Sequence, residues 1–242
     1  MTDGIGLLCT TAASIAVVHT LLGPDHYLPF VAMSRAGQWS FARTIAVTLA
    51  CGVGHVLSSA LLGSVGVGLG LAVFRLERIE AVRGDLAGWL LLAFGLAYAS
   101  WGVRRAVRSR PHEHWHAHSD GVVHKHPHVH VREHAHVHAA RGRAGAPGSA
   151  KATPWILFTI FVFGPCEPLI PLLMVPAARG SAGHVALVAA VFALCTISTM
   201  TAIVMISLRA VRSMGFPALG RFGHAVAGVV LIACGVAIQV GL

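Results

Sequence analysis

Residues 19–26 read HTLLGPDH and interrupt an apolar run that extends from about residue 5 to residue 33. The stretch holds two imidazoles and a carboxylate, and the pair Gly23-Pro24 stands between the histidines. Proline removes a backbone donor and clashes with the preceding helical turn, so this pair predicts a break in the apolar helix. Ionisable groups at such a place are costly in a bilayer and mark functional sites.

The composition of the whole chain is that of an integral membrane protein. Of 242 residues, 55% are hydrophobic and only 11% are charged, which is too little charge to coat a soluble protein of this size. No Lys or Arg precedes the first apolar run, so we expect it to stay in the mature protein rather than act as a cleaved signal. A bilayer-spanning helix needs about 20 apolar residues. The predicted spans are 5–33, 44–73, 86–103, 154–177, 184–208 and 222–241.

The basic residues predict an orientation. The net charge is +9, and most Lys and Arg side chains fall in the connections after the first, third and fifth spans. Because cytoplasmic connections carry the excess of Lys and Arg, we expect both termini on the outer side of a bacterial-type inner membrane and the long central loop in the cytoplasm. The lipid bilayer and metal ions are the expected partners, nucleic acid is not, and a homo-oligomer is left open.

The sequence contains an internal repeat. Gly23-Pro24-Asp25-His26 aligns with Gly164-Pro165-Cys166-Glu167, and small residues of the third span recur 140 positions later in the sixth. Because each half has an odd number of spans, the second half must be upside down relative to the first. We therefore predict an all-α integral membrane protein with six transmembrane helices in an inverted three-plus-three repeat, the first and fourth helices being broken. The predicted units are a first repeat at 1–105, a His-rich loop and linker at 106–152, and a second repeat at 153–242.

The residues around the two breaks are candidate metal ligands. Imidazoles, thiolates and carboxylates are the groups that divalent transition metals take from proteins, and substrate sites of inverted-repeat transporters lie where broken helices meet. The candidate ligands are His19, Asp25, His26 and His55 in the first half, with Cys166 and Glu167 in the second. The predicted breaks are Gly23, Pro24, Gly164 and Pro165, and the candidates for lining the pathway are Cys195, Thr199 and Met200.

Structural roles for these residues remain open. Asp25, His26 and Glu167 would also fit a buried ion pair that locks the two broken helices together. The other two histidines would fit hydrogen bonds between helices, and Cys166 would fit as a small apolar filler. Small polar residues in the fifth span would equally serve close helix packing.

A histidine-rich tract separates the third and fourth spans. It cannot build a hydrophobic core, and its composition is typical of metal binding; a pH-sensing or solvating linker is the alternative. A hairpin around residues 120–121 would pair His118 with His124 and His112 with His130, but Pro127 interrupts it, so we expect a disordered loop. The candidate loop ligands are His112, His114, His116, His118, His124, His126, His128, His130, His134, His136 and His138.

These motifs resemble the efflux branch of the nickel/cobalt transporter (NicO) family. That family belongs to the superfamily that also holds the lysine exporters (LysE), the TauE/SafE-type anion exporters and the DsbD-type thiol-disulfide electron carriers. HTLLGPDH looks like the family signature His-x4-Asp-His with one extra residue, and Gly54-His55 followed by small polar residues looks like its second signature. Residues 163–168, FGPCEP, are similar to the Pro-Cys-Pro-type break of the efflux branch, which also has a central His-rich loop.

The resemblance implies that His19, Asp25, His26 and His55 bind the metal, with Cys166 from the other half. We expect a secondary transporter of divalent transition-metal ions rather than an enzyme, with Ni²⁺ or Co²⁺ ahead of Zn²⁺ or Cu²⁺ as substrate. Export coupled to protons is favoured, no prosthetic group is expected, and the absence of a P-loop motif argues against direct use of ATP.

Three alternatives stay open. A small-anion or sulfur-compound exporter would need a basic residue inside a span, and none stands in a predicted span. A thiol-disulfide carrier would need a cysteine in each half, whereas the first half has Asp25 at the matching position. An accessory protein that delivers metal without transporting it is the third.

Overall fold

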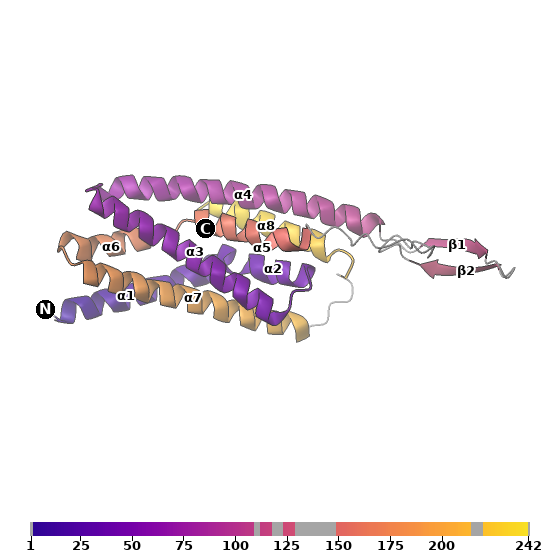
Figure 1. The fold of residues 1–242 in the computed structure, drawn as a ribbon, viewed down its shortest axis with the longest axis horizontal. Helices are drawn as coiled ribbons and strands as arrows, with labels where there is room; N and C mark the ends of the chain where they lie inside the picture. The colour runs from indigo at the N-terminus through magenta and orange to yellow at the C-terminus, as the bar shows by residue number, and fades with distance from the viewer. Residues whose placement is uncertain (1, 109–111, 118–122, 129–148, 214–219, 242) are drawn as a thin grey trace, which may run out of the picture.

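The computed structural model describes residues 2–108, 112–117, 123–128, 149–213 and 220–241. Within these ranges the chain forms a bundle of helices with a two-stranded hairpin beyond one end (Figure 1). The elements are α1 (Thr2–Leu22), the short 3-10 helix η1 (Pro24–His26), α2 (Leu28–Ala36), α3 (Phe41–Gly68), α4 (Val73–Arg108), β1 (His112–Ala117), β2 (Val123–His128), α5 (Ser149–Phe163), α6 (Leu169–Ala178), α7 (Ala182–Ser213) and α8 (Gly223–Gln239).

Both Gly-Pro pairs interrupt a helix, as the sequence predicts. α1 ends one residue before Gly23, and η1 and α2 follow it. In the second half, α5 ends one residue before Gly164, and α6 begins after residue 168. Pro24 occupies the first turn of η1, where a missing N–H needs no partner. α1 and α2 together, and α5 and α6 together, run from one end of the bundle to the other (Figure 1).

The prediction for the third span is wrong at its start. We placed it at 86–103, whereas α4 begins at Val73 and continues to Arg108. Its buried stripe extends at helical spacing well before residue 86, which explains why the helix starts so early. Glu80 and Arg83, which we assigned to a connection, therefore lie inside a long helix. The stripe consists of Leu76, Glu80, Gly84, Ala87, Gly88, Leu91 and Gly95.

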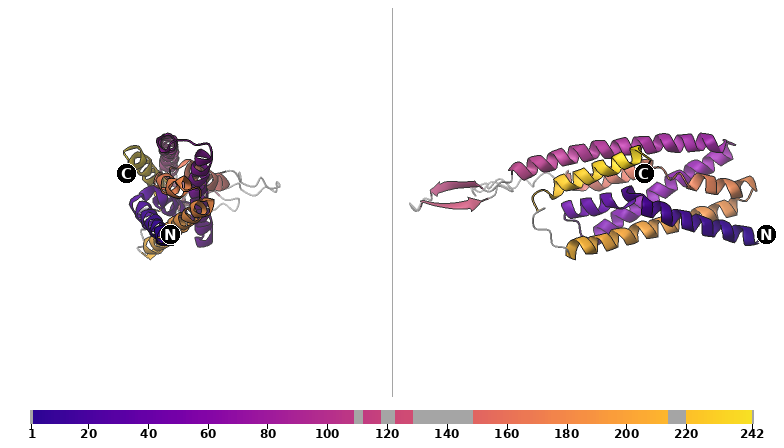
Figure 2. Two further views of the ribbon diagram at one scale, coloured as in Figure 1. Left: turned by 90° about the vertical axis from the view of Figure 1, so that its left-hand side faces the viewer. Right: turned by 180° about the vertical axis from the view of Figure 1, so that it is seen from behind.

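α8 lies along the half of α4 that leads toward the hairpin (Figures 1 and 2). A Cβ atom added to Gly95 would come within 2.7 Å of the backbone nitrogen of Ile232. A Cβ atom added to Gly235 would come within 2.8 Å of the backbone nitrogen of Leu92. Only glycine allows the two backbones to approach this closely, the arrangement that small residues permit between membrane helices.

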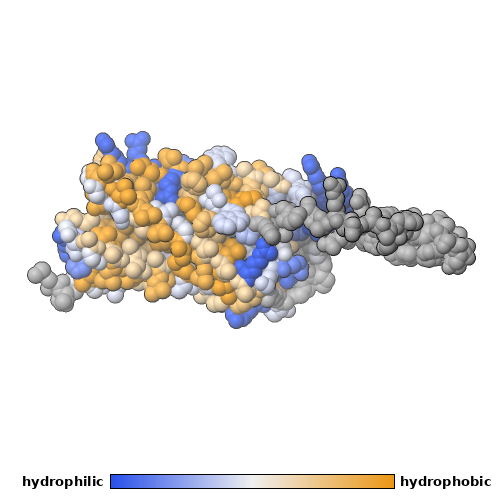
Figure 3. Space-filling view, viewed as in Figure 1, coloured by the Kyte–Doolittle hydropathy of each residue, from blue (hydrophilic) through white to orange (hydrophobic). Residues whose placement is uncertain are grey.

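Much of the bundle surface is apolar. Figure 3 shows hydrophobic residues covering most of the visible face, with hydrophilic residues gathered mainly toward the two ends. Large side chains point outward, among them Leu194, which is 72% exposed. Soluble monomers rarely carry apolar patches of this extent. Of the described helices, 4 are long and apolar enough to cross a membrane, namely Gly4–Leu22, Phe41–Gly68, Val73–Arg108 and Ala182–Val211. The chain thus has the make-up of a multi-pass membrane protein.

Two hydrophobic clusters fill the interior, and α3 passes through both. One cluster includes Cys51 together with Phe30 and Phe161 from the two broken segments. The other includes Val56 together with Cys166. The polar side chain of His55 therefore lies on α3 between two apolar cores.

The His-rich tract contains a hairpin, so the expectation of a disordered loop is wrong for residues 112–117 and 123–128. β1 and β2 are antiparallel, and the paired positions are His112 with His128, His114 with His126, and His116 with His124. This register differs by two residues from the one that we considered, and Pro127 is accommodated opposite Glu113. His118, His130, His134, His136 and His138 lie outside the described residues.

Candidate metal centre

Three predicted ligands meet inside the bundle. His19 comes from α1, His26 from η1 and His55 from α3, and one nitrogen of each lies within 4.8 Å of the others. The ring centroids of His19 and His26 are 4.9 Å apart, and those of His26 and His55 are 5.1 Å apart. The Nε2 atoms of all three are buried and have no hydrogen-bond partner. Buried polar atoms are nearly always paired in proteins, so three orphans in one place require an explanation.

Neighbouring oxygens fix the protonation of two of the rings. Nδ1 of His26 lies 3.1 Å from the carbonyl oxygen of Gly23 and 3.1 Å from Oδ1 of Asp25. Nδ1 of His55 lies 3.3 Å from the carbonyl oxygen of Phe161. Since carbonyl and carboxylate oxygens only accept, each Nδ1 carries the proton and donates it. When these rings are neutral, the lone pair is then on Nε2, the arrangement found in histidine ligands of metals.

The spacing of the three nitrogens is close to what a metal requires. Nitrogen ligands lie about 2.1 Å from a transition metal, so in a tetrahedral site two of them are about 3.4 Å apart. The observed limit of 4.8 Å means that the nitrogens need to approach one another by no more than about 1.4 Å. The site can therefore hold one ion through three neutral imidazoles.

The two helix breaks are both packed against this centre. A Cβ atom on Gly23 would come within 2.6 Å of Nδ1 of His26, and one on Gly164 would come within 3.1 Å of Nδ1 of His55. Each glycine therefore provides the space in which a histidine ring lies. Pro165, which follows Gly164 in the second break, packs against Gly84 of α4, where an added Cβ would lie 2.8 Å from the proline ring.

The remaining predicted ligands lie elsewhere. Asp25 is outside the group of three nitrogens and instead contacts the far side of the His26 ring; its side chain is 21% exposed. Cys166 is fully buried in the second apolar cluster, and its backbone N–H donates to Glu80. Glu167 is exposed. The structure thus assembles the group from first-half histidines, with the second half contributing the carbonyl oxygen of Phe161.

The predicted pathway residues of α7 lie at different depths. Met200 is buried, and its sulfur lies 3.5 Å from the Cβ position of Gly52, about one turn before His55 on α3. Cys195 and Thr199 are half-buried, and Cys195 packs against the second apolar cluster. The neighbouring Thr196 is buried with an unpartnered hydroxyl.

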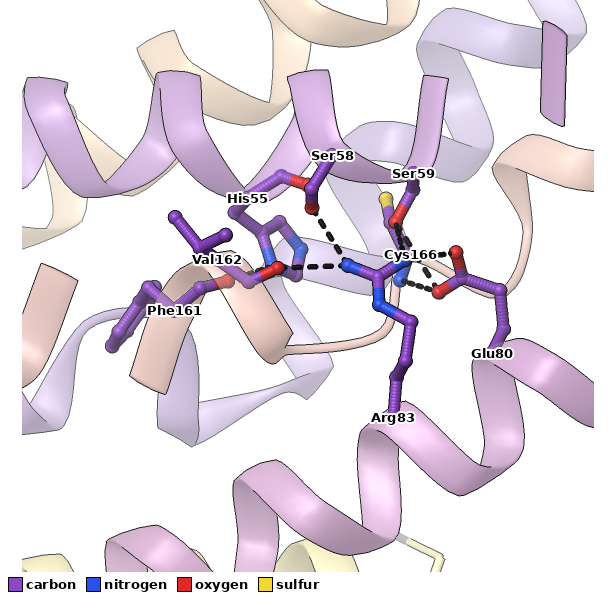
Figure 4. Close-up of polar contacts among 8 residues, drawn as sticks. All are labelled: His55, Ser58, Ser59, Glu80, Arg83, Phe161, Val162 and Cys166. Carbon is purple, nitrogen blue, oxygen red and sulfur yellow. Dashed lines mark hydrogen bonds and ion pairs between the residues drawn. The ribbon is translucent and has the colours of Figure 1, made fainter. Parts of the chain in front are cut away.

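Sequence reasoning missed a polar cluster behind His55, which Figure 4 shows. Glu80 and Arg83 of α4 form an ion pair, and both contact Ser59 of α3. Glu80 is fully buried. The signal that would have revealed it is the spacing of Glu80, Gly84 and Leu91, which continues the buried face of α4 toward its N-terminus.

Comparison of the chain with protein-family models, with curated proteins and with solved structures finds no match. The site is therefore interpreted from its own geometry: three buried, unpaired imidazole nitrogens between interrupted helices in an apolar bundle.

Proposed function

We propose that the protein is a secondary transporter of divalent transition-metal ions. The observation that carries the proposal is the group of His19, His26 and His55, which bring one ring nitrogen each to within 4.8 Å of one another and whose buried Nε2 atoms have no hydrogen-bond partner. Neutral imidazole suits nickel, cobalt, zinc and copper, and the resemblance of the motifs to the nickel/cobalt family puts Ni²⁺ and Co²⁺ first. A purely structural role would pair these atoms in hydrogen bonds.

We also propose that the bundle is an inverted repeat of six spans, with α1–α2 and α5–α6 each crossing as one broken span. The contacts between α4 and α8 support this. The contact of Gly95 with Ile232 has a counterpart displaced by the repeat offset of 140, that of Gly235 with Leu92. Two antiparallel helices that exchange equivalent contacts are related by a two-fold axis across them. The contact of Gly228 with Ala99 likewise matches that of Gly88 with Gln239.

The membrane orientation proposed from the basic residues agrees with the shape of the bundle. The N-terminus and the His-rich hairpin lie at opposite ends (Figure 1). If the connections at the hairpin end are cytoplasmic, as the positive-inside rule predicts, the hairpin meets cytosolic metal before the transport site does. This position favours export, with the tract collecting the ion that is to be moved.

Protons are the proposed counter-ions. Histidine binds metal only in its neutral form, so an ion and a proton compete for each Nε2 atom. An ion leaving on the acidic side would be replaced by protons, which are released again on the other side. Among the alternatives, thiol-disulfide exchange lacks support because all five cysteines are free and none stands at the first break.

The anion-exporter alternative needs a correction. Arg83 does lie inside α4, contrary to our expectation that no basic residue stands within a span. Its guanidinium is engaged, however, since it pairs with Glu80 and donates to Ser58 and to the carbonyl oxygen of Val162. An arginine held in this way by protein groups is a poor anion site.

Metal flux into proteoliposomes tests the proposed function. The purified protein is reconstituted, and the initial uptake of Ni²⁺, Co²⁺, Zn²⁺ and Cu²⁺ is followed with an internal metal-sensitive dye, with protein-free liposomes as the control. We expect saturable uptake of at least one of these metals, fastest for Ni²⁺ or Co²⁺, and faster when the lumen is more acidic than the bath, because outward proton flow then accompanies inward metal. Uptake equal to that of protein-free liposomes for all four metals would overturn the proposal.

Deletion of residues 112–138 is expected to leave transport intact but to shift its concentration dependence. The hairpin of β1 and β2 lies beyond the end of the bundle (Figure 1), far from the buried histidines, so we expect the tract to collect metal but not to carry it. We expect the half-saturating Ni²⁺ concentration to rise severalfold in the flux assay while the maximal rate stays within about twofold. Complete loss of flux from a correctly folded deletion variant would show instead that the tract is part of the route.

A further inference from the structure

Glu80 and Arg83 bind the two ends of the second helix break. Arg83 donates through Nη2 to the carbonyl oxygen of Val162, 2.7 Å away, in the last turn of α5. Glu80 accepts at Oε2 from the backbone N–H of Cys166, 3.2 Å away, just before α6. These backbone groups lost their helical partners at the break. One ion pair on α4 therefore replaces two of the hydrogen bonds that the break removes.

The signs of the two charges match the two helix ends. The C-terminal end of a helix carries partial negative charge and the N-terminal end partial positive charge. Arg83 stands at the C-terminal end of α5, and Glu80 stands beside the chain that leads into α6. Each charged side chain thus stabilises the end of opposite sign, and the two also neutralise each other across one turn of α4.

The same pair is connected to the candidate metal centre by two short routes (Figure 4). Val162, which Arg83 holds, follows Phe161, whose carbonyl oxygen accepts from Nδ1 of His55. Arg83 also donates to the hydroxyl of Ser58, 2.8 Å away. That hydroxyl donates in turn to the backbone carbonyl of His55, 2.8 Å away. The backbone of His55 therefore contacts a group that Arg83 binds, and its ring contacts the residue next to one that Arg83 binds.

We propose that Glu80 and Arg83 are positioning residues of the metal centre, which hold the second break so that the carbonyl oxygen of Phe161 keeps Nε2 of His55 free for the ion. This inference rests on the proposed transport function and assigns the second half its part in the site. Groups that orient a metal-binding histidine are typically worth about 10–100-fold in metal affinity.

The test measures Ni²⁺ flux by the full-length protein in proteoliposomes, as a function of Ni²⁺ concentration, for variants at these two positions. Arg83→Lys keeps the charge but loses the planar fork that reaches Val162 and Ser58 together. We expect its half-saturating Ni²⁺ concentration to rise about tenfold, with the maximal rate per folded protein changed by less than about threefold. Glu77→Gln and Arg78→Met, which change exposed charges on the same helix, are the matched controls and are expected to behave as wild type.

A charge swap separates positioning from simple charge pairing. The double variant E80R/R83E keeps an ion pair on α4 but places each charge against the helix end of the same sign. If the pair only neutralises itself, the swap restores wild-type flux; we expect it to be at least as impaired as Arg83→Lys. Folding is checked by circular dichroism and by elution as a single species, and Arg83→Lys carries the test if the swap does not fold.

The outcomes distinguish this inference from the function on which it rests. Absence of Ni²⁺ flux by the wild type, together with absence of flux of the other three metals, would overturn the transporter proposal itself. Flux by the wild type with an unchanged half-saturating concentration in Arg83→Lys would overturn only the positioning role. A lower maximal rate at unchanged half-saturation would do the same, because it indicates fewer folded copies rather than an altered site.

Discussion

His26→Ala is expected to reduce metal flux by at least about 100-fold. His26 lies between the other two histidines, with its ring 4.9 Å from that of His19 and 5.1 Å from that of His55. Its removal leaves only the nitrogens of His19 and His55 to bind the ion, without the third ligand that lies between them. Since groups that only orient a ligand are worth about 10–100-fold, loss of a central ligand should exceed that range. Initial rates of Ni²⁺ uptake in proteoliposomes measure the effect.

Asp25→Asn is expected to reduce metal flux less than His26→Ala, because Asp25 contacts a proposed ligand. Asp25 contacts the His26 ring at Nδ1 and is outside the group of three histidine nitrogens. An amide oxygen still accepts from Nδ1 but without the charge assistance, so we expect roughly a tenfold loss rather than complete loss. His184→Ala, which removes an exposed histidine from α7, is the control and should leave flux unchanged. Equal effects of His26→Ala and Asp25→Asn would contradict the assignment, because they would make Asp25 a ligand of the same rank.

The second large effect is expected on stability, from Gly95→Ala. Alanine normally favours a helix over glycine by about 1 kcal/mol. At Gly95, however, the added Cβ would lie 2.7 Å from the backbone nitrogen of Ile232 and 3.0 Å from the backbone oxygen of Gly228, neither of which can rotate away. The helices must separate, at a cost of about 1–3 kcal/mol for overpacking. We expect a clearly lower thermal unfolding midpoint in detergent, measured by circular dichroism.

The same measurement tests whether the equivalent glycine of the second half, Gly235, has the same role in packing. Gly235→Ala meets the backbone nitrogen of Leu92 at 2.8 Å and should lower the unfolding midpoint by a similar amount. Gly6→Ala is the control, because a Cβ there has nothing within 4 Å and the substitution should be neutral or slightly stabilising. If Gly95→Ala were as stable as Gly6→Ala, the close packing of α4 on α8 would be refuted.

The helix breaks and the histidines at their edge could be predicted because each depends on local chemistry. Gly23-Pro24 disrupts a helix through its own backbone chemistry, largely independently of its surroundings. An imidazole in an apolar run is costly to bury and therefore indicates a functional site. Which histidines would meet was not readable from spacing alone. His19 and His26 come together across the break, where η1 replaces the continuous helix between them, and His55 joins them only through the packing of α3.

The errors also have physical causes. Cys166 and Glu167 are predicted as ligands because the repeat aligns them with Asp25 and His26. The structure places them outside the group of three histidines, because sequence alignment does not carry side-chain direction through a break. Glu80 and Arg83 were assigned to a connection because charged residues lower the hydropathy of a window. Their ion pair offsets the cost of burial, so the helix continues through them. Hydropathy alone does not detect charges that are neutralised by each other.

The origin of the three imidazoles has a consequence for the transport cycle that we propose. His19, His26 and His55 all belong to the first half of the chain, whereas the second half provides the carbonyl oxygen of Phe161 and the packing around it. If the two halves arose by the duplication that we propose, the first copy provides the candidate metal ligands and the second copy supports them. In the proposed cycle, an ion bound in this way would move with one half of the protein instead of being passed between equal partners. Its entry and exit would face different surroundings, whereas the metal and proton gradients would set the net direction of transport.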